Sequence, residues 1–64
     1  MKPRDKAIEA LKQNGYIFKR HGANHDIYCN EKTQMIIPLK RHDFDDSDLR
    51  YIQKEIKHNN RGQE

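Results

Sequence analysis

Residues 16–39 read YIFKRHGANHDIYCNEKTQMIIPL, and this stretch decides the fold. It holds three short runs rich in β-forming residues, at 16–20, 25–29 and 34–39, separated by polar segments typical of turns. Pro38 cannot donate a hydrogen bond to a neighbouring strand, so the third run is expected to be an edge strand or to end there. Three strands with short turns predict an antiparallel meander.

A helix is predicted on each side of this meander. Pro3 suits a first helical turn and Gly15 suits a helix end, which places the first helix at residues 4–13. An Asp or Ser among residues 45–47 is expected to cap the second helix. Apolar residues recur at helical spacing in both segments. They are Ala7, Ile8 and Leu11 in the first helix and Leu49, Ile52 and Ile56 in the second.

The predicted fold class is therefore α+β, in the order α-β-β-β-α. A three-stranded antiparallel sheet with two helices on one face is the simplest way to bury both helical stripes. We expect one domain over residues 1–57. Residues 58–64 hold no apolar side chain and are expected to form a polar, frayed tail.

The chain has 64 residues, so it can build only one thin core. This size excludes a multidomain enzyme, a Rossmann unit with its partner half, a barrel and a deep cofactor chamber. A single cysteine, Cys29, excludes an internal disulfide framework and favours a reducing, cytoplasmic location. No apolar run approaches the length of a membrane helix, and the N-terminus lacks the apolar stretch of a signal peptide.

The charge is uneven along the chain. The net charge is +3, with nine Lys or Arg and four Asp or Glu in residues 1–41 but four and six in residues 42–64. A basic front half indicates a surface that faces a polyanion, whereas a solvated exterior of mixed charge is the simpler alternative.

One candidate for acid–base chemistry stands out. His25 opens the second strand directly after a turn that contains Gly22, where a side chain is both fixed and reachable. Histidine titrates near neutral pH and suits proton transfer. Asp26 would point to the opposite face of a regular strand, which leaves Asn24 as the better polar neighbour. The alternative is an ordinary surface histidine in a hairpin.

Two basic segments flank this position, and both are candidates for binding RNA phosphates. We expect them to form a basic rim around His25, although a solvated bend is the alternative for the second. The candidate RNA-binding residues are Lys19 and Arg20 in the first segment, Lys40, Arg41 and His42 in the second, and Asn24 beside His25. No metal site is predicted, because the chain has no second cysteine and His21 and His25 span a turn. Among the aromatic residues we expect Phe18 in the core, and Cys29 is expected to be a small buried filler.

Four stretches together resemble the HicA (YcfA-like) family of toxins from HicAB toxin–antitoxin systems. They are ALKQNGY at 10–16, GANHDIY at 22–28, IPLKRH at 37–42 and LRYIQKEI at 49–56. The resemblance covers about residues 4–57. Many family members have Gly-Ser before the histidine where this chain has Ala23 and Asn24, and a shorter Pro-Arg-His segment than the one that ends here at His42.

The resemblance implies a double-stranded-RNA-binding-domain-like fold and a function. Family members are mRNA interferases: they cleave RNA without a metal or a small-molecule cofactor, using one histidine that matches His25. A HicB antitoxin covers their active site. Two alternatives from other classes stay open, which are a module that binds RNA without cutting it and a protein-interaction domain that uses the acidic residues 43–48.

Overall fold

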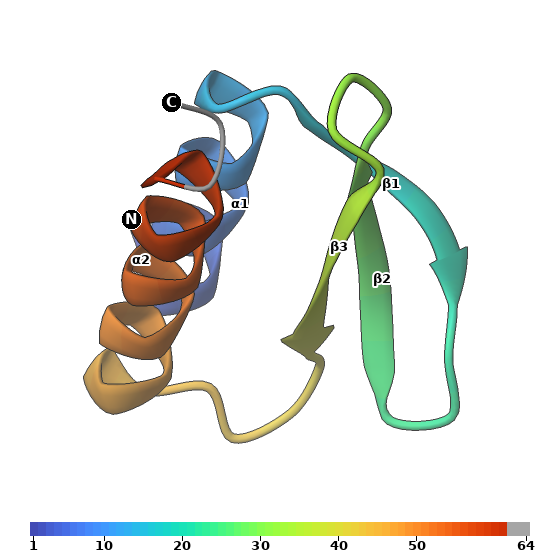
Figure 1. The fold of residues 1–64 in the computed structure, drawn as a ribbon. Helices are drawn as coiled ribbons and strands as arrows, with labels where there is room; N and C mark the ends of the chain where they lie inside the picture. Colours follow the sequence, from blue (N-terminus) through green and yellow to red (C-terminus); the bar gives the residue numbers. More distant parts are fainter. Residues whose placement is uncertain (62–64) are drawn as a thin grey trace.

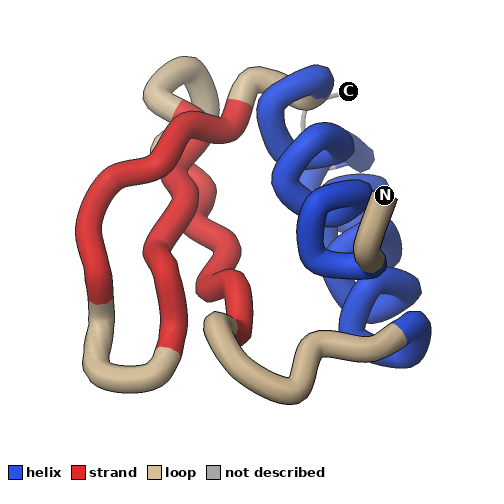
Figure 2. Tube along the Cα trace, turned by 180° about the vertical axis from the view of Figure 1, so that it is seen from behind, coloured by secondary structure: helices blue, strands red, loops and turns tan. Residues whose placement is uncertain are grey.

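The computed structural model describes residues 1–61, and it has the predicted order of elements. Both helices lie on one face of the three-stranded sheet, as the two opposite views in Figures 1 and 2 show. The predicted α+β fold class is thus confirmed. The elements are α1 (Pro3–Gln13), β1 (Tyr16–His21), β2 (His25–Asn30), β3 (Met35–Lys40) and α2 (Asp46–Arg61).

The sheet has the strand order β1-β2-β3, with both pairs antiparallel. The third strand is therefore an edge strand, which accommodates Pro38 as the sequence predicts. The register shifts between Phe18 and Arg20, so that Lys19 is the extra residue of a β-bulge in β1. Beyond this bulge His21 lies opposite Asp26. The bulge thus decides which side chain of β1 meets that carboxylate.

A single core lies between the sheet and the helices. The predicted stripes of both helices contribute to it, except that Ile8 is only partly buried. Each fully buried Leu or Ile side chain contributes about 1.5–3 kcal/mol of transfer free energy. So small a core makes every member important to the stability of the domain. Its residues are Ala7, Leu11, Tyr16, Tyr28, Ile37, Leu39, Leu49, Ile52 and Ile56.

The connection from α1 to β1 depends on Gly15. Its φ of 85° lies in the left-handed region, which glycine adopts without a steric penalty. A Cβ atom there would also lie 3.3 Å from the Asn30 side chain, whose amide nitrogen donates to the Asn14 carbonyl oxygen at 3.2 Å. The Asn14-Gly15 stop predicted from the sequence therefore also docks β2 against the end of α1.

The second helix starts at the predicted place. Asp45 and Asp48 form a reciprocal cap, in which each carboxylate accepts a hydrogen bond from the other residue's backbone N–H, at 3.1 and 3.0 Å. This is the geometry of a capping box, with Asp in the position that Glu or Gln usually occupies. It fixes the direction in which α2 leaves the polar bend after β3.

The end of α2 differs from the prediction. We expected a frayed tail from residue 58, but the helix continues to Arg61. Polar side chains anchor this last turn: the Asn59 amide donates to the Tyr16 hydroxyl at 2.9 Å, and the Asn60 amide donates to the Asn14 side-chain oxygen at 3.2 Å. Hydrophobic periodicity cannot reveal such contacts. Residues 62–64 of the predicted tail lie outside the described residues.

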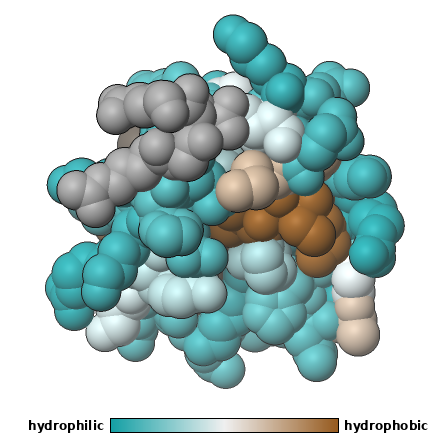
Figure 3. All heavy atoms as spheres, viewed as in Figure 1, coloured by the Kyte–Doolittle hydropathy of each residue, from teal (hydrophilic) through white to brown (hydrophobic). Residues whose placement is uncertain are grey.

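The prediction for Phe18 is wrong, because this side chain is 45% exposed. It sits on the edge strand β1, where it packs edge-on against the Tyr28 ring and contacts the His21 ring. Tyr16 and Tyr28 occupy the core instead, and Cys29 is buried as expected. Ile17 and Ile36 are each at least half exposed. The space-filling view shows an apolar patch near the middle of a mostly hydrophilic face (Figure 3).

Candidate functional site

His25 is the first residue of β2 and its side chain is exposed. It borders a hollow of about 170 Å³ between the end of the sheet and the start of α2. The hollow combines a histidine, a cation, a carboxylate and two aromatic rings. Its other lining residues are Pro38, Lys40, Phe44, Asp48, Tyr51 and Ile52.

The loop that presents His25 is held by Arg41. The Arg41 guanidinium donates to the carbonyl oxygens of Gly22 at 2.7 Å and Ala23 at 2.5 Å. Its backbone N–H donates to the Asn24 carbonyl oxygen at 3.3 Å. All three residues of the loop are therefore tied to the chain just after β3. Arg41 was expected to bind phosphate, but these contacts make it a clamp on the loop before His25.

Gly22 allows the loop to close tightly. Its N–H donates to the His25 carbonyl oxygen at 2.6 Å. A Cβ atom at position 22 would lie 3.0 Å from that same oxygen, so a larger residue would require the His25 backbone to shift by a few tenths of an ångström. Glycine thus suits the close backbone approach at this position. Together with the Arg41 clamp, this closure fixes where the His25 backbone stands.

A network of charged side chains lies beside this loop and is centred on Asp26, which is only 8% exposed. One carboxylate oxygen lies 2.7 Å from His21 Nδ1, and the other accepts a hydrogen bond from Arg4 of α1 at 2.6 Å. Arg41 Nη1 lies 3.9 Å from Oδ1 of the same carboxylate. Three segments distant in the chain thus converge on one carboxylate. Asp26 does face away from His25, as the alternation of β2 predicts.

The pKa of Asp26 lies below its ordinary value. Burial alone would raise this pKa, but the hydrogen bonds from His21 and Arg4 and the charges on both groups outweigh burial. The carboxylate is thus ionised at neutral pH and at mildly acidic pH. It can hold Arg4 and Arg41 in place over the whole physiological range.

The lowered pKa of Asp26 predicts that the folded protein loses stability in acid. At pH 5 and above, Asp26 is ionised in the folded and the unfolded chain, so its contribution to stability is constant. As the pH falls below about 4, the unfolded chain takes up the proton first, and the stabilisation is lost as the pH passes through the lower folded-state pKa. We expect the free energy of unfolding, measured by urea titration from pH 5 to pH 2, to fall more steeply for the wild type than for Asp26→Asn. If the free energy of unfolding falls equally steeply with pH in both proteins, Asp26 is not the source of the acid sensitivity. The pKa of Asp48 is also lowered, chiefly by the backbone N–H of Asp45, and it contributes equally to both curves.

Lys40 is the predicted phosphate ligand that the structure places beside His25. The two residues are paired across β2 and β3, and both border the same hollow. The Lys40 ammonium group donates to the Asp43 carbonyl oxygen at 3.2 Å and lies 3.6 Å from an Asp48 carboxylate oxygen. Its side chain is 45% exposed, so it can still approach an anion in the hollow.

The other predicted residues do not complete a rim around His25. Lys19 and Arg20 are exposed on β1, and β2 separates that strand from Lys40. Lys19 borders a different hollow of about 330 Å³, together with Ile17, Phe18, Cys29, Glu31 and Gln34. Asn24 and His42 are both exposed, Asn24 in the loop directly before His25 and His42 in the bend after β3. The structure thus groups His25 with Lys40, Asn24 and Arg41 but leaves the β1 cations apart.

Sequence reasoning missed two features of the site. It did not foresee that His21 and Asp26 would pair, although the backbone hydrogen bond between Gly22 and His25 closes the hairpin and places these two residues next in the register. It also did not place Phe44 and Tyr51 at His25, since only the packing of α2 against β3 brings them there. The pairing of His21 with Asp26 could have been predicted from the hairpin register. No local sequence pattern predicts the position of Phe44 and Tyr51.

Within residues 1–61, no group of three or more His, Cys, Asp or Glu side chains could hold a metal ion. Neither helix in this part of the chain is long and apolar enough to cross a membrane.

Comparison with known proteins gives no relative on which a function could rest. No family model matches the chain, and no curated protein or solved structure is significantly similar to it.

Proposed function

We propose that this protein is the toxin of a HicAB-type toxin–antitoxin system, a cytoplasmic endoribonuclease that cleaves mRNA and thereby inhibits translation. One observation carries the proposal: an exposed histidine, His25, stands at the end of a clamped loop and borders a hollow with a half-exposed lysine. The aromatic residues of the hollow add surfaces on which nucleobases stack. The resemblance to HicA assigns the same histidine as the catalytic group.

The chemistry follows from these groups. His25 takes the proton from a ribose 2′-hydroxyl, and the 2′-oxygen attacks the adjacent phosphorus atom. The bond from phosphorus to the 5′-oxygen breaks, that oxygen takes up a proton from water, and the protonated His25 releases its proton to the solvent. The products are a 2′,3′-cyclic phosphate and a free 5′-hydroxyl. Lys40 stabilises the negative charge that builds up on the phosphate oxygens, and proton transfer by His25 accounts for a rate gain of roughly 10²–10⁴-fold.

The position of the hollow also fits regulation by a second protein. His25 is exposed and its hollow is small and superficial, so a HicB-like antitoxin could block it by covering the surface around β2, β3 and the start of α2. Such a cover would exclude RNA without altering the catalytic residue. The partner in this proposal is thus an antitoxin protein, and the substrate is mRNA.

A test of this function separates it from the two alternatives. The purified chain is incubated with single-stranded RNA in excess EDTA, beside a mock preparation from cells without the gene. We expect the RNA to be cut by the protein alone. If the RNA is bound in a salt-sensitive manner but stays intact, the protein is an RNA-binding module and not a ribonuclease. RNA that is neither bound nor cut would favour the protein-interaction domain.

A further inference from the structure

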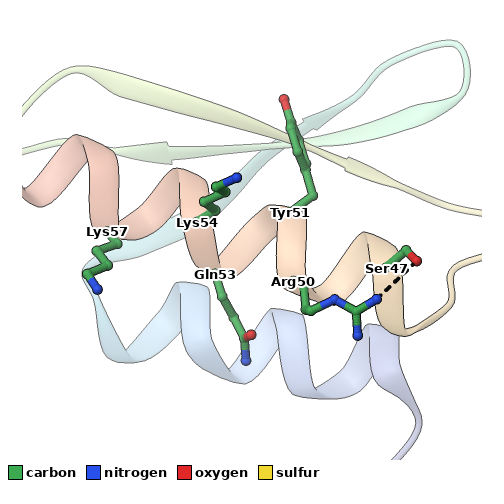
Figure 4. Close-up of a pocket in the computed structure, with 6 residues that line it drawn as sticks. All are labelled: Ser47, Arg50, Tyr51, Gln53, Lys54 and Lys57. Carbon is green, nitrogen blue, oxygen red and sulfur yellow. Dashed lines mark hydrogen bonds between the residues drawn. The ribbon is translucent and has the colours of Figure 1, made fainter.

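The outward face of α2 carries a second, larger hollow, with a volume of about 550 Å³. Figure 4 shows the side chains that border it, all projecting from this one helix. Three of them are cations and none is acidic, so the surface is suited to a polyanion. The lining residues are Ser47, Arg50, Tyr51, Gln53, Lys54 and Lys57.

The cations of this face are available to a ligand. Arg50, Lys54 and Lys57 are all exposed. Arg50 donates a hydrogen bond of 3.3 Å to the Ser47 hydroxyl, and no described carboxylate lies within ion-pair distance of Lys54 or Lys57. Lys57 lies seven positions after Arg50 in the helix, which is roughly 10 Å along the axis. The cations are thus spread along a track and do not form one point of charge.

Tyr51 connects this track to the hollow at His25, because it borders both. Its side chain is 56% exposed and projects from α2 toward the strands (Figure 4). Exposing so large a ring has no benefit for the core. A ring at the junction of a basic track and a catalytic hollow is placed to stack on a base.

These features favour single-stranded RNA over a duplex. Unpaired bases can be splayed out and stacked on aromatic side chains, whereas paired bases in an A-form helix present no free face. We propose that a single strand of RNA lies along the outer face of α2, with phosphates at Lys54 and Lys57 and one base on Tyr51. The strand then leads into the hollow where His25 acts. Only this last step rests on the proposed catalytic function. In this proposal the substrate binds mainly to the cations of α2, and not to Lys19 and Arg20 of β1.

The test measures binding separately from cutting. All variants are made in a His25→Ala background, and the probe is a fluorescent single-stranded oligoribonucleotide of mixed sequence. The dissociation constant is measured from 50 to 200 mM NaCl. Lys54→Ala combined with Lys57→Ala is expected to reduce the slope of log K against log salt by about 1.4, since each phosphate contact contributes about 0.7 for a single strand. Lys32→Ala, in the β2–β3 turn, removes a lysine that is also exposed and should leave the slope unchanged.

Tyr51 is tested in the same assay. Tyr51→Ala is expected to weaken binding by about 5- to 150-fold, the range for loss of one stacked base, and Tyr51→Phe should retain most of the affinity. An unchanged salt slope in the lysine double variant, or full affinity in Tyr51→Ala, would contradict the proposal that RNA binds along α2. If the variants behave as expected but the wild type cuts no RNA, the proposed RNA binding along α2 is supported and only the catalytic proposal is wrong. All substituted side chains are exposed, and circular dichroism checks that each variant is folded.

Discussion

Replacing His25 with alanine is expected to reduce the rate of RNA cleavage by about 10²–10⁴-fold, the usual contribution of one positioned acid–base group. The side chain is exposed, so its loss removes no core contact and the variant should unfold at the same temperature as the wild type. RNA binding should change little, because the proposed binding residues lie on α2 and at Lys40. The measurement is the initial cleavage rate of one defined RNA at saturating concentration.

A second histidine provides the control for this substitution. His58 is also exposed, but it lies on α2 and borders none of the hollows described above. His58→Ala should therefore cleave RNA at the wild-type rate. If His25→Ala also cleaves at that rate, another group is the catalyst or the activity comes from a contaminant, and the proposed mechanism is wrong.

Replacing Arg41 with alanine is expected to slow cleavage by about 10²-fold, although this side chain is assigned no contact with RNA. Its guanidinium holds the carbonyl groups of Gly22 and Ala23, and a displacement of about 1 Å at a catalytic group can cost this much. A positioning residue of this kind should lower kcat and leave KM nearly unchanged. Steady-state kinetics on folded protein, verified by thermal unfolding, tests this.

The conservative variant sharpens the distinction. Lysine keeps the charge, but its ammonium group reaches less far than the guanidinium Nη2, the one nitrogen that donates to both carbonyl oxygens, so Arg41→Lys should recover only part of kcat. If Arg41→Ala instead raises KM with kcat unchanged, Arg41 binds phosphate as the sequence suggested. Full recovery in Arg41→Lys would likewise favour a role for charge alone.

The order of elements could be predicted because each one has a local signal. The stripe at Leu49, Ile52 and Ile56, the glycine stop at Gly15 and the alternation around Tyr28 all depend on residues close in the chain. The errors have a common cause in long-range packing. The exposure of Phe18 follows from its place on an edge strand, and the last turn of α2 is held by contacts with residues 14 and 16.

The candidate site shows the same division. His25 could be selected from the sequence because a histidine after a glycine turn is a local feature. The role of Arg41 could not, since it depends on the carbonyl groups of a loop 18 and 19 residues away. The Asp26 network needs α1 to fold back beside the sheet, which brings Arg4 to a carboxylate 22 residues away in the sequence. Basic residues were recognised as a class, but the fold alone decides which of them share a surface.

The central claim is that His25 activates a ribose 2′-hydroxyl to cut RNA. The most direct measurement uses one RNA strand and a matched strand that carries a single 2′-deoxy nucleotide on the 5′ side of the mapped cut, both incubated with the wild-type protein in excess EDTA. We expect cleavage of the all-ribose strand to a 2′,3′-cyclic phosphate and a 5′-hydroxyl end, and no cleavage at the deoxy position. Cleavage at that position, or of an all-deoxy strand, would contradict the central claim.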